Sequence, residues 1–449
     1  SSNIGSSIIH GQKRVGKTSV ARVLQSYLTK MDYTVIYLEA GDYIDPTAKK
    51  TISGLGVKLC NKIREYEPRV AHLSVPQFGE ALSPLTEFMD EVERIVPGHR
   101  LVIILDEFDQ LPLDLYLRGS LGDAFFLTLR SISSRPNIGF ILVGGERMTH
   151  IMDCQGIQLN KWGVIQVDYF TRDSDWPDYR ELIQHPVTGT LEYSEDALIA
   201  LHDITAGNPY FTKLVCQQVF REAVAKRDCY IARAEIARAI EAAVRESKLN
   251  TFQHFWEDGI FETGERATEK SIRRRKILIA LIDVLSKQAP VPFSLVSSHP
   301  LVKDIPTLEN DLKEFVTRKI LVCNLQDDSY DIKVRLFHEW LKRCGIQDII
   351  ATFSDLDAVL KQRQQDEKLK ILPEEIIKVI DGWGLYKGQQ ITETKVRIWL
   401  DQFEDVRDQR AMFSILQRLH FYGNLFVRKK LAEANDVVTR GLIRYLETR

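Results

Sequence analysis

The sequence predicts an α/β protein that begins with a doubly wound parallel sheet and continues as helical modules. Three observations predict this. Residues 11–18 have the spacing G-x-x-x-x-G-K-[ST] and follow a short apolar run. Residues 101–105 form an apolar, β-branched run that ends in Asp106 and Glu107, as expected of a strand buried on both faces. Short apolar runs alternate with helical spacing to about residue 170, which is typical of a parallel sheet that binds ligands at its strand ends.

Five strands are expected in this first domain, and we assign it residues 1–186. They are residues 8–9, 33–38, 101–105, 139–143 and 164–167. Helical spacing fills the intervals, for example at 57–63 and 85–95. The glycine-rich and acidic motifs both fall at the carboxyl ends of the expected strands, so we expect them to meet at one edge of the sheet.

Three further regions follow. Residues 187–248 are predicted to form a helical lid without strands, with helices at 197–204, 209–222 and 233–244. Residues 249–345 are predicted to form a winged helix-turn-helix, because helices at 275–285 and 307–318 precede apolar strands at 320–323 and 332–336. Residues 346–449 are predicted to be helical, and no internal repeat is evident.

The glycine-rich loop predicts a polyphosphate site. Gly11 and Gly16 let the backbone curl so that N–H groups point at phosphate oxygens, and the following helix directs its positive end at the same anion. Lys17 is expected to reach the β- and γ-phosphates, and the Thr18 hydroxyl to ligate Mg²⁺. The predicted phosphate-binding residues are Gly11, Gln12, Lys13, Arg14, Val15, Gly16, Lys17, Thr18 and Ser19.

The acidic pair after the third strand predicts hydrolysis. In proteins with such a loop, an acid at this strand tip holds the magnesium ion, and a following Glu polarises the attacking water. We therefore expect Asp106 to hold Mg²⁺ and Glu107 to act as the general base. The alternative is that the two acids merely begin a solvated turn.

Composition restricts the class of protein. The net charge of −2 over 449 residues argues against a surface built throughout for nucleic acid. No apolar run approaches the roughly 18 residues of a membrane span, and no signal peptide is recognisable. The six cysteines are scattered without metal-ligand spacing, so we expect buried, reduced thiols and a cytoplasmic location. The sequence begins with Ser1 close to the loop, which suggests a fragment of a longer chain.

Taken in order, the motifs resemble the STAND branch of the AAA+ ATPases, signalling NTPases of bacterial conflict systems. Besides the two motifs above, the resemblance uses Gly-Gly-Glu-Arg at 144–147, Gly-Asn-Pro at 207–209 and Leu-Phe-His-Glu-Trp-Leu at 336–341. It implies ATP with Mg²⁺, slow hydrolysis that resets a switch, and assembly with further copies or an effector protein. It also implies that Arg147 senses the γ-phosphate and that Pro209 packs on adenine. The alternatives are a surface arginine after a turn and simple helix punctuation.

Adenine is also favoured over guanine by the residues themselves. Guanine-specific loops of this kind carry Asn/Thr-Lys-x-Asp late in the sheet, but residues 160–163 lack the Asp. Residues 29–32 fit the letters at the wrong end of the domain.

DNA binding by the winged helix is the main alternative function, as in a DNA-dependent AAA+ motor or loader. The charges disfavour it, because the expected wing carries Asp327, Asp328 and Asp331, and the expected recognition helix opens near Glu309 and Asp311. The basic run at 273–276 is expected either to cap the start of a helix or to pair with Glu265 and Glu269 instead.

The C-terminal region yields less. Residues 399–426 are similar to the helical part that precedes phosphoribosyltransferase modules fused to conflict ATPases. The paired acids and Ser/Thr-Gly loop of a phosphoribosyltransferase site do not occur, so we expect any effector enzyme to lie beyond residue 449 or on another chain.

Overall fold

The computed structural model describes residues 4–45, 47–285, 289–324 and 326–352. Residues 1–349 form one compact unit, and residues 350–449 belong to a second. The helices expected after residue 352, and the similarity at 399–426, therefore lie outside the described residues. Within the described part, no helix combines the length and the apolar character needed to cross a membrane.

A five-stranded parallel sheet forms the first domain, as predicted. Its strands are β1 (Ser7–His10), β2 (Thr34–Glu39), β3 (Leu101–Asp106), β4 (Ile138–Gly144) and β5 (Gly163–Gln166). Their order is β2-β3-β4-β1-β5, and every neighbouring pair is parallel. Every residue of β3 and β4 is buried, which explains why both read as continuous apolar runs rather than alternating ones.

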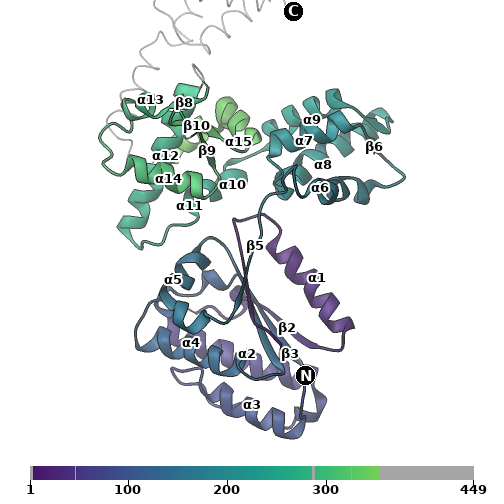
Figure 1. The fold of residues 1–449 in the computed structure, drawn as a ribbon, viewed down its shortest axis with the longest axis vertical. Coiled ribbons are helices and arrows are strands. Elements are labelled where there is room, and N and C mark those ends of the chain that lie inside the picture. The colour runs from purple at the N-terminus through teal and green to yellow at the C-terminus, as the bar shows by residue number, and fades with distance from the viewer. Residues whose placement is uncertain (1–3, 46, 286–288, 325, 353–449) are drawn as a thin grey trace, which may run out of the picture. The chain divides into compact units, whose positions relative to one another are not determined.

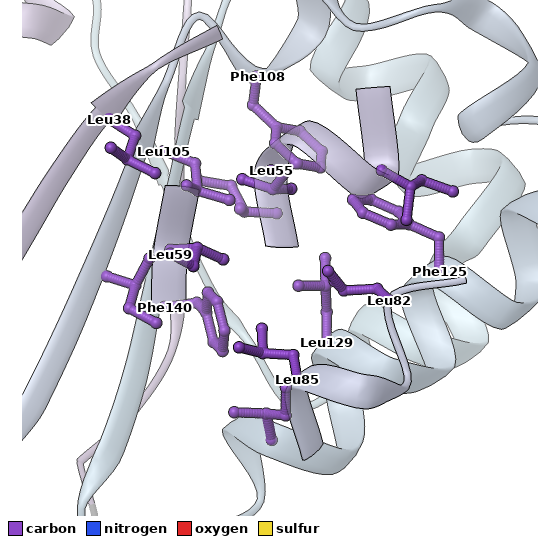
Figure 2. Packing of buried hydrophobic residues seen from close by; sticks show 14 of the residues in the cluster. Leu38, Leu55, Leu59, Leu82, Leu85, Leu105, Phe108, Phe125, Leu129 and Phe140 are labelled. Atoms are coloured by element: carbon purple, nitrogen blue, oxygen red, sulfur yellow. The ribbon is translucent and has the colours of Figure 1, made fainter. Parts of the chain in front are cut away.

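Helices cover the two faces of this sheet unequally (Figure 1). α1 (Lys17–Lys30) lies on one side, whereas α2 (Ala48–Tyr66), α3 (Pro84–Ile95), α4 (Ser120–Ser133) and α5 (Arg147–Leu159) lie on the other. The larger core is on the second side. Figure 2 shows Leu105 and Phe140 of the sheet facing Leu59 of α2 and Phe125 of α4. Burying such side chains stabilises the fold by about 1.5–3 kcal/mol each, which keeps the carboxyl ends of β1, β3 and β4 at one edge.

The helical lid contains a short sheet that the sequence does not predict. Its helices are α7 (Glu195–Thr205), α8 (Pro209–Lys226) and α9 (Arg233–Glu246). α6 (Trp176–Gln184) lies before the expected boundary at residue 187 but packs against α8, where the Tyr179 hydroxyl lies 3.0 Å from the Thr212 hydroxyl. The expectation of a lid without strands is wrong, because β6 (Glu192–Tyr193) pairs with β7 (Tyr230–Ile231). Each strand has two residues and is completed by bonds such as Glu192 N to Cys229 O at 2.8 Å. Segments this short leave no alternating pattern in the sequence.

The next module has helix-turn-helix and wing elements. It comprises α10 (Leu249–Phe252), α11 (His254–Glu257), α12 (Glu265–Leu285), β8 (Val291–Pro292), α13 (Phe293–Ser297), α14 (Leu308–Thr317), β9 (Leu321–Asn324), β10 (Ser329–Ile332), α15 (Arg335–Trp340), a π-helical turn (Leu341–Gly345) and α16 (Ile346–Ala351). The antiparallel sheet has the order β8-β10-β9. The second strand of the wing was expected at 332–336. It ends at Ile332, because the register pairs Ser329 with Asn324 and the chain already turns into α15 at Arg335.

Aromatic side chains join the lid to the winged-helix module. Phe211 of α8 lies 5.3 Å from Phe252 of α10, measured between ring centroids, and Phe252 lies 4.8 Å from Trp340 of α15. Phe255 and Phe337 complete the cluster at 4.7 Å. All five rings are almost fully buried. Burial of this much aromatic surface couples the two modules firmly.

All six cysteines are free, as expected, but they are not uniformly buried. Cys60 is buried, Cys229 is exposed in the loop before β7, and the other four are intermediate. The expectation of buried thiols therefore holds fully only for Cys60. The sequence signal was misleading because an apolar neighbourhood does not fix which face of an element a cysteine occupies.

Candidate functional site

The phosphate loop connects β1 to α1 in the backbone conformation that its glycines permit. Gly16 has φ +97° immediately before α1, and Arg14 has φ +70°. A Cβ at Gly11 would lie 2.2 Å from the carbonyl oxygen of Val167, so a side chain there would collide with the backbone. The Lys17 ammonium donates to the Gln12 carbonyl at 2.9 Å, which folds the lysine back over the loop.

Two acidic residues, Asp106 and Glu107, lie at the carboxyl end of β3. Asp106 is buried, and its Oδ1 accepts from the Glu107 N–H at 2.8 Å. The Tyr37 hydroxyl of β2 donates to its other oxygen. Glu107 has φ +53° and lies at the pocket mouth. Partial burial, and then the Asp106 charge, raise the pKa of Glu107, which suits a group that must take up a proton.

These motifs line one cavity of about 680 Å³. The predicted residues on its wall are Lys13, Arg14, Gly16, Lys17, Thr18, Ser19, Asp106, Glu107, Arg147 and Pro209. Arg147 is the first residue of α5, and Pro209 is the first residue of α8. Asn208 caps α8 by accepting from the Tyr210 N–H at 2.9 Å. The structure thus brings predicted residues of the first domain and of the helical lid to one site.

Three predicted residues are not on the wall, although their loop is. Gly11 is buried behind it, and Val15 is 4 % exposed within the core. The Gln12 side chain faces away from the cavity, donating to the Arg318 carbonyl at 2.9 Å and accepting from the Tyr169 hydroxyl. The Gln12 side-chain amide is thus engaged by the Arg318 carbonyl and the Tyr169 hydroxyl, and phosphate binding by Gln12 through its backbone N–H stays a prediction.

The cavity places the partly desolvated Lys17 ammonium near several carboxylates. Burial lowers the pKa of Lys17, although the carboxylates of Asp109 and Asp106, followed by Glu146 and Asp258, act to raise it. A polyphosphate beside the ammonium would raise that pKa further. The Thr18 hydroxyl and the Asp106 carboxylate are oxygen donors on the same wall, and Mg²⁺ typically takes one or two protein oxygens plus phosphate and water. These residues fit a magnesium nucleotide.

No larger metal cluster is present in the described ranges: no group of three His, Cys, Asp or Glu residues is arranged to hold an ion.

Several wall residues were missed by the sequence reasoning. They are Asp109, Gln110, Gly144, Gly145, Glu146, Leu182, Tyr210, Lys213, Glu257, Asp258 and Gly259. Position after β3 or β4 could have identified Asp109 and Glu146, and Tyr210 follows the predicted Pro209. The centroid of the Tyr210 ring lies 4.3 Å from Cζ of the Arg14 guanidinium. Asp258 carries no local signal, because it reaches the cavity only through tertiary packing.

The winged-helix module also grips the phosphate loop directly. Arg14 donates to the carbonyl of Asn250 at 3.1 Å and to that of Thr251. Arg318, at the end of α14, forms an ion pair with Glu146 at 2.6 Å. Lys319 forms another with Asp168. The nucleotide cavity is consequently closed on one side by residues more than 200 positions from the loop.

The basic run at 273–276 makes different pairs from those expected. Arg273 pairs with Asp311 at 3.2 Å, and Arg274 with Glu314 at 2.6 Å. For these two arginines the expected partners Glu265 and Glu269 are wrong, because their guanidinium groups turn towards the carboxylates of α14. Asp311 is itself buried, so its carboxylate does not lie on the outer surface of the expected recognition helix, where it was expected to repel DNA.

Comparisons with known proteins agree with the fold described for the first domain. The family model described as an AAA domain matches residues 2–152. Among solved structures, the ORC2 protein of Aeropyrum pernix is 14 % identical, with 79 % of this chain and 90 % of that chain covered and a TM-score of 0.50. ORC1 of the same organism, solved with DNA, is 11 % identical over 76 % and 88 %, with a TM-score of 0.37.

RuvB of Thermotoga maritima, a Holliday junction branch migration motor, is 11 % identical over 73 % and 84 %, with a TM-score of 0.38. Comparison with curated proteins gives no match. At these identities the ORC2 likeness speaks for the fold alone. Residues 2–152 thus match an AAA domain with a P-loop fold, in a chain folded like ORC2 with a helical lid and a winged helix.

Proposed function

We propose that this chain is an ATP-binding, slowly hydrolysing switch in which the nucleotide site controls the position of the winged-helix module. The observation that carries the proposal is that the phosphate loop serves both purposes. Lys17 and Thr18 line the cavity, while Gln12 and Arg14 hydrogen-bond to the winged-helix module. A ligand that changes this loop therefore acts on both, and a ligand shifts only an equilibrium between states that it binds differently.

Each predicted residue has one role in this proposal. Lys17 and the loop N–H groups bind the β- and γ-phosphates, and Thr18 and Asp106 hold Mg²⁺, which neutralises charge on the phosphates. Glu107 takes the proton of the attacking water. Arg147 contacts the γ-phosphate, and Pro209 packs against the adenine. Tyr37 positions Asp106 through its hydroxyl.

The finer identity is a STAND-type switch of a bacterial defence system that assembles with further copies or an effector protein. What supports it is the order of motifs in the sequence. The internal charges agree, since Arg273 and Arg274 of the basic run are used in ion pairs with α14.

A DNA-dependent motor or loader is the second candidate, and the comparisons favour it more directly than they favour the defence switch. The ORC1 structure contains DNA, and the RuvB structure is described as a branch migration motor. The surface charge argues the other way. On α14, the exposed Lys313 is paired with Glu309 at 2.5 Å, and the wing turn carries Asp327 and Asp328. Affinity for DNA comes largely from cations free to neutralise phosphates.

Nucleotide titration tests the shared part of both candidates. We expect calorimetry with ADP and with a non-hydrolysable ATP analogue, each with Mg²⁺, to give binding that Lys17→Ala abolishes. Lys30→Ala, at the exposed end of the same helix, is the matched control and should bind normally. Glu107→Gln should bind nucleotide but lose phosphate release. Absence of heat with either nucleotide would refute the proposal.

Two further measurements separate the candidates. A switch should change its oligomeric state in light scattering when the ATP analogue replaces ADP, with turnover indifferent to DNA. A motor should show turnover that duplex DNA stimulates, with an affinity that falls steeply as salt rises.

A further inference from the structure

One carboxylate in the nucleotide cavity belongs to the winged-helix module rather than to the AAA domain. Asp258 follows α11 and lines the cavity together with Lys17 and Arg147. Its neighbours there include Lys13, Lys17 and Asp109, which are the groups whose charges act on it besides Arg318. No hydrogen bond or ion pair within 4 Å ends on its side chain in the described part of the chain. The Asp258 carboxylate is therefore not neutralised by a directly bonded partner.

The backbone around Asp258 is held rigidly. The buried Arg274 guanidinium donates to the Asp258 carbonyl at 2.6 Å and to the Trp256 carbonyl at 3.2 Å, and it is itself anchored on Glu314. Gly259 follows with φ +68°, and a Cβ there would lie 2.5 Å from Glu146 Oε2. The loop is thus fitted against the Glu146–Arg318 ion pair and cannot move aside without breaking contacts.

A second carboxylate, that of Glu146, also opposes a negative ligand beside Asp258. Oε1 of Glu146 is buried and without a hydrogen-bond partner. Burial, chiefly, raises the pKa of Glu146, and the Asp258 charge adds to the effect. Both carboxylates act on the Lys17 ammonium, the group that is expected to meet the terminal phosphates. A like charge brought close to two desolvated carboxylates is strongly disfavoured.

We propose that Asp258 is the residue by which this chain distinguishes a nucleoside triphosphate from a diphosphate: its carboxylate repels the γ-phosphate, so that the closed arrangement accepts ADP and ATP displaces the winged-helix module. The inference rests on the proposed function, because it needs an adenine nucleotide in the cavity. It goes further by naming the determinant of selectivity and the element that moves. The repulsion acts on the closed state only, which is the differential interaction that a switch requires.

The test uses the full chain and three proteins: wild type, Asp258→Asn and Glu257→Gln. Glu257 is the matched control, because it is the adjacent carboxylate on the same wall but is exposed and bonded to Gln253. Calorimetry gives dissociation constants for ADP and for the non-hydrolysable ATP analogue with Mg²⁺. Allosteric couplings are typically 5- to 150-fold, and we expect Asp258→Asn to favour the analogue over ADP by roughly tenfold relative to wild type. Glu257→Gln should leave the ratio within about twofold.

A second readout follows the module itself. Protease cleavage near the core–winged-helix contact should increase with the analogue in wild type, and this increase should shrink in Asp258→Asn. If Asp258→Asn alters both affinities equally, or weakens the analogue only when Mg²⁺ is present, Asp258 is a structural residue or a magnesium ligand and the inference fails. An equal shift with Glu257→Gln also overturns it. Absence of nucleotide binding by wild type would instead refute the proposed function.

Discussion

The ion pair between Glu146 and Arg318 allows the closed arrangement to be tested quantitatively. The side chains are 13 % and 7 % exposed and lie 2.6 Å apart. Arg318 also donates to the Phe255 carbonyl at 2.8 Å and to the His254 carbonyl at 3.1 Å. Removing one partner of a buried pair typically costs about 3–5 kcal/mol, because the remaining charge stays buried and unpaired. We therefore expect Arg318→Gln to destabilise the closed unit by about 3–5 kcal/mol.

Glu146→Gln should cost less, because Arg318 keeps its two carbonyl acceptors. The double variant should cost less than the sum of the single variants, since the second change removes the charge that the first left unpaired. Urea unfolding of the four proteins gives these values. Arg22→Gln is a control, because its pair with Glu39 is half exposed and is worth less than about 1 kcal/mol. Additive effects, or a cost for Arg318→Gln no larger than that of the control, would refute the reasoning.

Two further predictions concern the same contact. Gly259→Ala should lower the free energy of unfolding in urea by roughly 1–3 kcal/mol, because it combines a left-handed φ with a Cβ 2.5 Å from Glu146. Gly264→Ala is the control, because Gly264 has φ +61° and open space around it, so its cost reports the backbone strain alone. Equal costs for the two variants would show that crowding against Glu146 plays no part. Burial, chiefly, lowers the pKa of His254 well below its usual value, so the unfolded chain binds the proton more readily and stability falls as pH drops below about 6.5. His254→Phe should reduce this loss by up to about 1.4 kcal/mol per pH unit, and an unchanged pH profile would contradict it.

The fold of the AAA domain was predictable because its signals are local and strong. β3 and β4 are buried on both faces, so their apolar runs are unbroken, and the loop at 11–18 has a fixed spacing between strand and helix. The lid strands β6 and β7 were not predictable, since two residues do not establish a period. The end of β10 was misplaced because the apolar residues after Ile332 belong to the start of α15.

The site was predictable only where one motif carries it. Lys17, Asp106 and Glu107 follow from spacing at the ends of β1 and β3. Asp258 does not, because its place in the cavity depends on Arg274 bonding the backbone around it from another helix. The true partners of Arg273 and Arg274 were equally hidden, since Asp311 and Glu314 are about 40 positions away along the chain.

The grip of the winged-helix module on the phosphate loop has an evolutionary consequence. In most loops of this kind the residues between the two glycines are free to drift, provided that their N–H groups remain. Here Gln12 and Arg14 of the loop are bound to backbone carbonyls of the winged-helix module. Outside the loop, the same contact includes two ion pairs, Glu146 with Arg318 and Asp168 with Lys319. In descendants that keep the closed arrangement, each pair should mutate jointly. A lineage that loses one residue of an ion pair while retaining the other should no longer form the closed arrangement, although it keeps the cavity beside the phosphate loop.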